Sequence, residues 1–152
     1  MFSLIITIIS IALVVALAIA SIYYGGAAFT QGNTRAVAAT VVSQAQQIAG
    51  GATLSFNQTQ TVPASVAALQ TSGYLTSVPN VPAAANATTA WTISATEVGH
   101  VITSDAVCNA IDASAKGTSP ATFAGNPPAA KVTTQQYGCF GTTGAATFYY
   151  AY

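Results

Sequence analysis

Charged side chains are nearly absent from this sequence. Among its 152 residues, three basic residues, Arg35, Lys116 and Lys131, balance three acidic ones, and charged residues make up 4% of the chain. An ordinary soluble domain carries about 25%. Without an excess of one sign, no electrostatic field attracts nucleic acid or an acidic ligand, so we expect no nucleic-acid site. A net charge of zero does not keep copies apart, which favours a subunit that associates with itself.

Side chains that perform catalysis or bind metals are also scarce. The sequence has one histidine, His100, and two cysteines, Cys108 and Cys139. These are too few for a typical zinc site, and we predict no metal, no cofactor and no enzyme activity. A hydrolase with a nucleophilic set of Cys108, His100 and Asp105 is a remote alternative. We disfavour it because Cys108 is better used in a disulfide and a lone histidine in a strand is usually structural.

The two cysteines lie in the part of the chain that we expect to be exported. An even number of cysteines in such a domain indicates a disulfide, here between Cys108 and Cys139. Two buried free thiols are the alternative. Closing a loop of about 30 residues contributes about 3.5 kcal/mol to stability, which is large for a small domain.

An uncharged apolar run, MFSLIITIISIALVVALAIA, occupies residues 1–20. As a helix, Phe2–Ala20 would be about 28 Å long, close to the thickness of the hydrocarbon core of a bilayer. Its Ser and Thr hydroxyls can bond to preceding carbonyls. The run has neither the basic n-region of a secretory signal nor the flanking Lys or Arg of a plain anchor. We therefore also consider a helix that leaves lipid and packs against copies of itself.

The composition changes directly after this run. Tyr23 and Tyr24 fit the aromatic belt of a membrane interface. Gly25 and Gly26 predict a bend or a melted turn, because each glycine costs a helix about 1 kcal/mol. We therefore place an apolar transmembrane or filament-core helix at residues 1–26.

Residues 27–152 are expected to form one small head. Residues 27–50 carry an apolar stripe at helical spacing and are predicted as the amphipathic half of a long helix that ends at Gly50-Gly51. Residues 51–90 are predicted as a connecting loop region with a short helix, and residues 91–152 as a β-sheet and disulfide region. The predicted core residues of the head are Val37, Val41, Ile48, Leu69, Tyr74 and Trp91.

Local patterns place the smaller elements of the head. Short helices are predicted at Pro63–Gly73, with Val66 and Leu69 buried, and at Ser104–Ala113, with Ser104 as N-cap. Alternating polarity predicts a hairpin and two closing strands, at Trp91–Ala95 with Val98–Thr103, and at Cys139-Phe140 with Thr147–Tyr152. A long helix followed by an antiparallel sheet is an α+β fold.

Three motifs together resemble one family. FSLI at Phe2–Ile5 opens the apolar run as in type IV pilins, and LQTSGYLTSVP at Leu69–Pro79 is similar to the loop that joins helix and sheet in that group. SDAVCNAI at Ser104–Ile111, then FAGN, a second cysteine and a terminal ATFYYAY resemble the disulfide-bounded region of type IVb pilins, the bundle-forming and conjugative thin-pilus kind. The resemblance covers essentially the whole chain.

The resemblance implies a long N-terminal helix packed on a small antiparallel sheet, and a major pilin that polymerises with itself. It also implies residence in the inner membrane before assembly, action of a pilus assembly machinery, N-terminal methylation and an extracellular fimbrium used for attachment, motility or conjugative contact. The residues expected to pack the filament core are Phe2, Leu4, Ile5, Ile6, Ile8, Ile9, Leu13, Val14 and Leu17. A minor pilin, a pseudopilin or a membrane-anchored monomer of a secretion or pilus machine is the alternative.

The sequence departs from the family pattern near its start. Family members carry a glutamate five residues into the mature chain, where this sequence has Ile5 or Ile6. A buried terminal ammonium without a partner is costly, so we expect the amine to stay near solvent or to be served by Ser3, Thr7 or a carbonyl. The family's basic leader is not seen, and we interpret the sequence as the mature form. Two sites, Asn57-Gln-Thr59 and Asn86-Ala-Thr88, match the N-glycosylation pattern.

Overall fold

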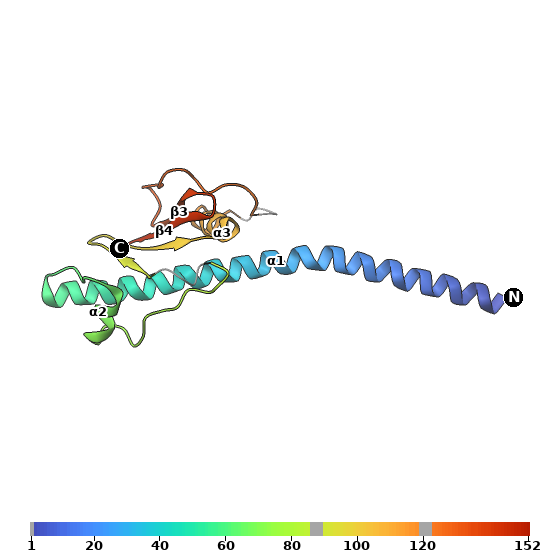
Figure 1. Cartoon of the computed structure of the whole chain (residues 1–152), viewed down its shortest axis with the longest axis horizontal. Helices are drawn as coiled ribbons and strands as arrows, with labels where there is room; N and C mark the ends of the chain where they lie inside the picture. Colours follow the sequence, from blue (N-terminus) through green and yellow to red (C-terminus); the bar gives the residue numbers. More distant parts are fainter. Residues whose placement is uncertain (1, 86–89, 119–122) are drawn as a thin grey trace. The chain divides into compact units, whose positions relative to one another are not determined.

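The computed structural model describes residues 2–85, 90–118 and 123–152, so the Asn86 glycosylation motif lies outside the described residues. The chain divides into two compact units, Met1–Asn33 and Thr34–Tyr152. Our sequence boundary lies earlier, after residue 26. Figure 1 shows the elements in chain order: α1 (Phe2–Thr59), α2 (Val66–Thr71), β1 (Thr92–Ile93), β2 (Glu97–Ile102), α3 (Asp105–Ala115), β3 (Tyr137–Thr142) and β4 (Ala145–Ala151). The predicted α+β class is confirmed.

The first unit consists of the N-terminal part of α1. Gly25 and Gly26 lie inside this helix, so the expectation of a melted turn is corrected. A Cβ at either position would meet nothing within 4 Å, and helix-forming residues flank the pair on both sides. The cost of about 1 kcal/mol per glycine is therefore not enough to interrupt the hydrogen-bond ladder.

The end of α1 also differs from the prediction. The helix continues through Gly50 and Gly51 to Thr59, because Gly51 serves packing rather than termination. A Cβ on Gly51 would lie 3.2 Å from Cγ of Leu75 and 3.3 Å from the carbonyl oxygen of Tyr74. The glycine thus lets the segment after α2 approach the helix backbone. Ala52 and Ser55 on the following turn are buried as well, so tertiary contacts extend the helix.

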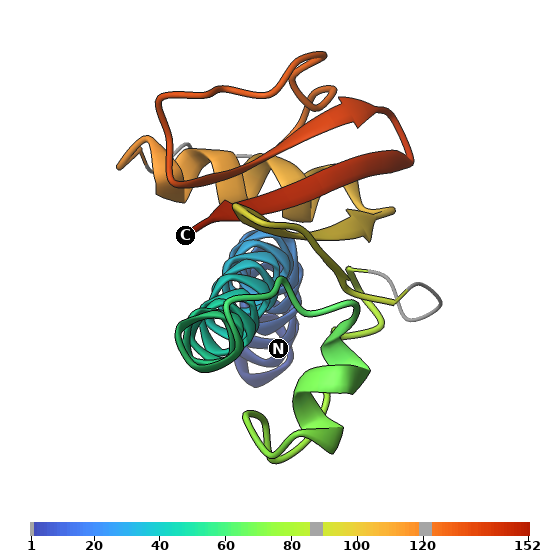
Figure 2. The same ribbon diagram turned by 90° about the vertical axis from the view of Figure 1, so that its left-hand side faces the viewer.

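The sheet has four antiparallel strands in the order β1-β2-β4-β3. The last strand of the chain is therefore central, with His100 of β2 and Cys139 of β3 both opposite Phe148. Figure 2 shows this sheet and α3 over the part of α1 that belongs to the second unit, with α2 beside the helix. The core between these layers contains Val41, Ala45, Ile48, Val98, Ile102, Val107, Ile111, Ala146 and Phe148.

The small elements follow the local signals closely. The first short helix begins at Val66 rather than at Pro63, because the Ser65 hydroxyl caps it by accepting a hydrogen bond from the Ala68 N–H at 3.2 Å. The second is capped by Ser104 as predicted. The predicted hairpin forms with only two residues in β1, where Ile93 pairs with Val98.

Candidate functional site

The first unit presents large apolar side chains that its own chain does not cover. The residues predicted to pack a filament core are all exposed, by 53 to 84% of their surface: Phe2, Leu4, Ile5, Ile6, Ile8, Ile9, Leu13, Val14 and Leu17. We call the exposed apolar side chains of Phe2–Phe29 the apolar helix surface. A second copy, or lipid, is needed to remove it from water.

The apolar helix surface is larger than the sequence prediction. Ile11, Val15, Ile19, Ile22 and Phe29 are exposed by 51 to 79% but were not included among the predicted packing residues. Successive helical residues point about 100° apart, so an unbroken apolar run covers every side of the helix. The apolar composition of residues 2–22, interrupted only by small hydroxyl residues, was the signal that could have identified the first four of these residues, whereas Phe29 lies beyond that stretch.

The same helix is long and apolar enough to cross a membrane, and among the described residues it is the only one. None of its most apolar window is buried within the chain. Two of its hydroxyl groups bond to preceding carbonyls of the helix: Thr7 Oγ1 donates to the Leu4 carbonyl at 2.8 Å, and Ser10 Oγ donates to the Ile6 carbonyl at 2.8 Å. The helix could therefore anchor in lipid with these two side-chain donors paired.

The second unit buries its own core separately. Val37, Val41, Ile48, Leu69 and Trp91 are all buried there, and Tyr74 is half-buried against them. The Trp91 indole donates to the Pro79 carbonyl at 2.9 Å, and the Tyr74 hydroxyl donates to Gln58 Oε1 at 2.7 Å. The head thus has a complete core and does not need the apolar helix surface for one.

A disulfide joins α3 to β3. Cys108 and Cys139 are bonded, with their Cα atoms 5.5 Å apart, and both are buried. One helical turn after Cys108, the Asp112 carboxylate Oδ1 accepts a hydrogen bond from the Cys139 N–H at 2.8 Å. Two side chains of α3, four residues apart, therefore hold the same residue of β3.

Asp112 is the buried carboxyl group of the head. Its side chain lies between α3 and β3, and the residue is 6% exposed. Burial raises the pKa of Asp112 above its ordinary value of 3.8, while the Cys139 N–H and the charge of Lys116 act in the opposite direction.

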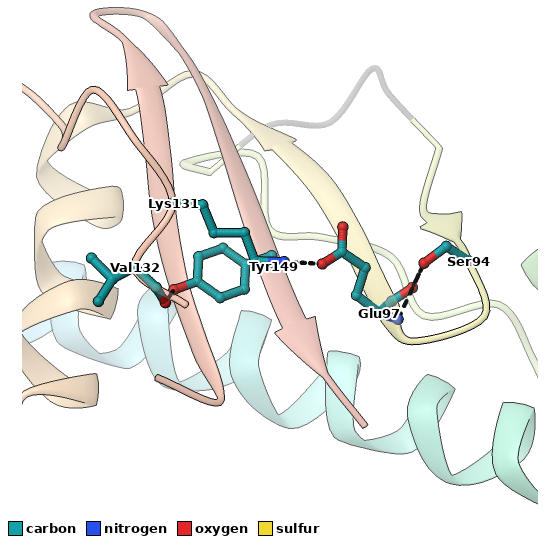
Figure 3. A network of polar contacts seen from close by, with 5 residues as sticks. All are labelled: Ser94, Glu97, Lys131, Val132 and Tyr149. Carbon is teal, nitrogen blue, oxygen red and sulfur yellow. Dashed lines mark hydrogen bonds and ion pairs between the residues drawn. The ribbon is translucent and has the colours of Figure 1, made fainter. Parts of the chain in front are cut away.

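Figure 3 shows a second polar network, on the outer side of the sheet. Lys131 forms an ion pair with Glu97 and lies 4.6 Å from the centre of the Tyr149 ring. The Tyr149 hydroxyl donates to the Val132 carbonyl at 2.7 Å, and the Glu97 N–H donates to Ser94 Oγ at 3.2 Å. These contacts fasten the segment before β3 to β2 and β4. Burial is the main cause that raises the pKa of Tyr149 above 10.0, followed by the negative charge of Asp112.

The residues of the hydrolase alternative have other contacts. Cys108 is in the disulfide, and Asp105 Oδ1 accepts a hydrogen bond from the Gly144 N–H at 2.9 Å. His100 is buried, with its Nδ1 2.7 Å from the Val101 carbonyl oxygen and its ring 4.8 Å from that of Trp91. The structure therefore provides no free thiol for a cysteine nucleophile at position 108. The described residues contain no group of three or more His, Cys, Asp or Glu placed to hold a metal ion.

A shallow groove of about 380 Å³ lies between α1 and α3 in the second unit. Val42, Phe123 and Tyr137 form part of its walls, and the Arg35 guanidinium carbon lies 5.3 Å from the centre of the Phe123 ring. The groove is open to solvent and contains no convergent set of reactive groups.

No family model matches the chain, and neither a curated protein nor a solved structure matches it. The long apolar N-terminal helix and the small antiparallel sheet are consistent with a pilin-like fold.

Proposed function

We propose that the chain is the structural subunit, the major pilin, of a bacterial type IV pilus, most like the type IVb pilins. In this proposal the subunit resides in the inner membrane before assembly. It is then assembled into an extracellular helical filament for attachment, motility or conjugative contact. The observation that carries the proposal is the apolar helix surface. All large apolar side chains from Phe2 to Phe29 are exposed, although the head has its own buried core.

The free energy of apolar burial supports this function. Each Å² of apolar surface removed from water contributes about 25 cal/mol, so the helix is strongly unfavourable in water. Lipid solvates it as well as other helices do, and moving it from the bilayer into a filament therefore yields little free energy by itself. An assembly machinery must supply the free energy for that transfer. Once assembled, a subunit cannot return to water without exposing the whole surface.

A filament rather than a closed ring follows when the contacts between copies are heterologous and do not close. The apolar helix surface covers every side of its helix, so one helix can contact several neighbours at once. The head has few charges to oppose the approach of identical heads. The filament would therefore be a homopolymer with the helices inside and the heads outside.

A minor pilin, a pseudopilin or a membrane-anchored monomer is the second candidate. The observation that favours it is the single membrane-length helix among the described residues, which would serve equally well as a simple anchor. Recovery of the chain only in membranes, and never in filaments, would support this candidate.

Electron microscopy of sheared cell-surface material, with an antibody against the head, tests the proposal. We expect labelled filaments from cells that carry the unchanged chain. Leu13→Lys, which places a charge in the apolar helix surface, should abolish these filaments. Thr133→Lys is the matched control, because Thr133 is exposed on the head, and it should leave filament number unchanged. Filaments that form equally well with Leu13→Lys would contradict the proposed packing.

A further inference from the structure

The outer edge of β3 carries the observation that goes beyond filament formation. β3 pairs only with β4 and is an edge strand of the sheet. Two of its outward N–H groups are nevertheless occupied: that of Gly141 donates to the Pro128 carbonyl at 2.8 Å, and that of Cys139 donates to Asp112 Oδ1 at 2.8 Å. An N–H group that is already bonded in this way cannot donate to another strand. A carboxyl group thus closes one position of this edge.

The second oxygen of that carboxyl group has an unusual environment. Asp112 Oδ2 is buried and has no hydrogen-bond partner among the described residues. A charged carboxylate in this position is costly, because one of its two oxygens is desolvated without compensation. A neutral carboxyl group costs less, because no charge is buried, and it can still accept the Cys139 N–H through Oδ1.

The surroundings hold the carboxyl group tightly. A Cβ built on Gly138 would lie 3.0 Å from Asp112 Oδ1 and 2.8 Å from the Tyr149 hydroxyl oxygen. The carboxyl group and the phenol therefore share the space above Gly138. The disulfide one turn earlier keeps Cys139 next to α3 whatever the charge of Asp112. A change of charge would then alter the edge of β3 without separating the two elements.

Few other titratable groups face this carboxyl group. Lys116 approaches it from the end of α3, and Tyr149 from β4. The remaining titratable groups of the packed strands are engaged elsewhere: Glu97 with Lys131, His100 against Trp91, and Tyr137 stacked on Tyr150. Among these titratable groups, Asp112 is therefore the one whose protonation most directly affects the contact between α3 and β3.

We propose that Asp112 is a proton-operated latch on the edge of the sheet: the head is most stable when this carboxyl group is neutral, and the contact of Asp112 with the edge of β3 weakens when the group is charged, while the disulfide keeps α3 and β3 together. The direction of its pKa shift agrees. Stabilisation by a carboxyl group whose pKa is raised on folding is complete below the unfolded value of 3.8 and is lost as the pH rises through the folded value. This inference does not depend on whether the chain forms filaments.

Thermal unfolding of the full chain in detergent micelles between pH 3.5 and 7.5, followed by near-ultraviolet circular dichroism, tests the latch. Asp112→Asn keeps an oxygen that can accept the Cys139 N–H but cannot be charged. We expect the unfolding temperature of the unchanged chain, relative to Asp112→Asn, to rise as the pH falls. Asp105→Asn is the matched control, since it removes a carboxylate that also accepts a backbone N–H at a partly exposed position. The rise in unfolding temperature at low pH should therefore remain in Asp105→Asn.

A difference between the unchanged chain and Asp112→Asn that stays constant with pH, or that reverses, would overturn the proposal. If Asp112→Asn does not fold, the carboxyl carbon of Asp112 in the unchanged chain can be followed by NMR against pH. A midpoint above 3.8 supports the latch, and a midpoint at or below this value refutes it.

Discussion

Gly138 and Tyr149 face each other across β3 and β4, and a Cβ on the glycine would lie 2.8 Å from the tyrosine hydroxyl oxygen. The phenol occupies the space that any other residue at position 138 would need. Its hydroxyl is bonded to the Val132 carbonyl, so it cannot move aside without losing that bond.

Gly138→Ala is therefore expected to destabilise the head by about 1–3 kcal/mol through overpacking. Urea unfolding of the full chain in detergent, followed by Trp91 fluorescence, measures the change. Gly50→Ala is the opposite control: a Cβ there meets nothing within 4 Å, and alanine should stabilise the helix by about 0.5–1 kcal/mol. Equal effects of the two substitutions would contradict the packing at Gly138.

Loss of the disulfide should cost about 3.5 kcal/mol by the loop-entropy model, since the two cysteines are 31 residues apart. Chemical unfolding with and without dithiothreitol measures it. A double variant, Cys108→Ser with Cys139→Ser, should be as unstable as the reduced chain and insensitive to the reductant. A reduced chain that is as stable as the oxidised one would show that the bridge adds nothing.

Removal of the Lys131 ammonium is expected to have a small effect. The ion pair with Glu97 is partly exposed, so Lys131→Met should cost about 0.5–1 kcal/mol at low salt. High salt screens exposed pairs, and the difference should shrink in 1 M sodium chloride. Unfolding midpoints at both salt concentrations provide the test, and a difference that grows with salt would be inconsistent with an ion pair.

Tyr149 should ionise late in an alkaline titration. Its pKa is raised above 10.0 by burial, so the stabilisation associated with the neutral phenol is present below pH 10 and is lost as the pH rises through the folded value. Absorbance at the phenolate band should show a late component from Tyr149 and Tyr152, whose pKa burial also raises. Tyr149→Phe should reduce that component. An unchanged late component would assign it to other tyrosines.

Burial of the apolar helix surface in a filament can be measured by chemical labelling. A cysteine at position 13 (Leu13→Cys) should be protected from a water-soluble maleimide in intact filaments. A cysteine at the exposed head position 133 (Thr133→Cys) should react. Labelling at position 13 as fast as at 133 would mean that the helix is not inside the filament, and would contradict the proposed function.

Much of the fold was predictable because the signals are local. Ser104 caps α3 through a bond to Val107 N–H, three residues away, and β1 pairs with its neighbour β2. The end of α1 was not predictable in this way. A pair of glycines is a typical signal for the end of a helix. Here Tyr74 and Leu75 approach Gly51 closely, and the helix continues to Thr59.

The sequence by itself determined that the first part of the chain is an apolar helix with no charge, since seventeen of its first twenty side chains are apolar and this property does not depend on contacts with distant residues. It also determined the α+β class and indicated the disulfide. Only the tertiary structure decided that β4 is central in the sheet, that Asp112 closes the edge of β3, and that Lys131 joins Glu97 and Tyr149. These features depend on residues far apart in the chain, whose positions are set when the whole head packs.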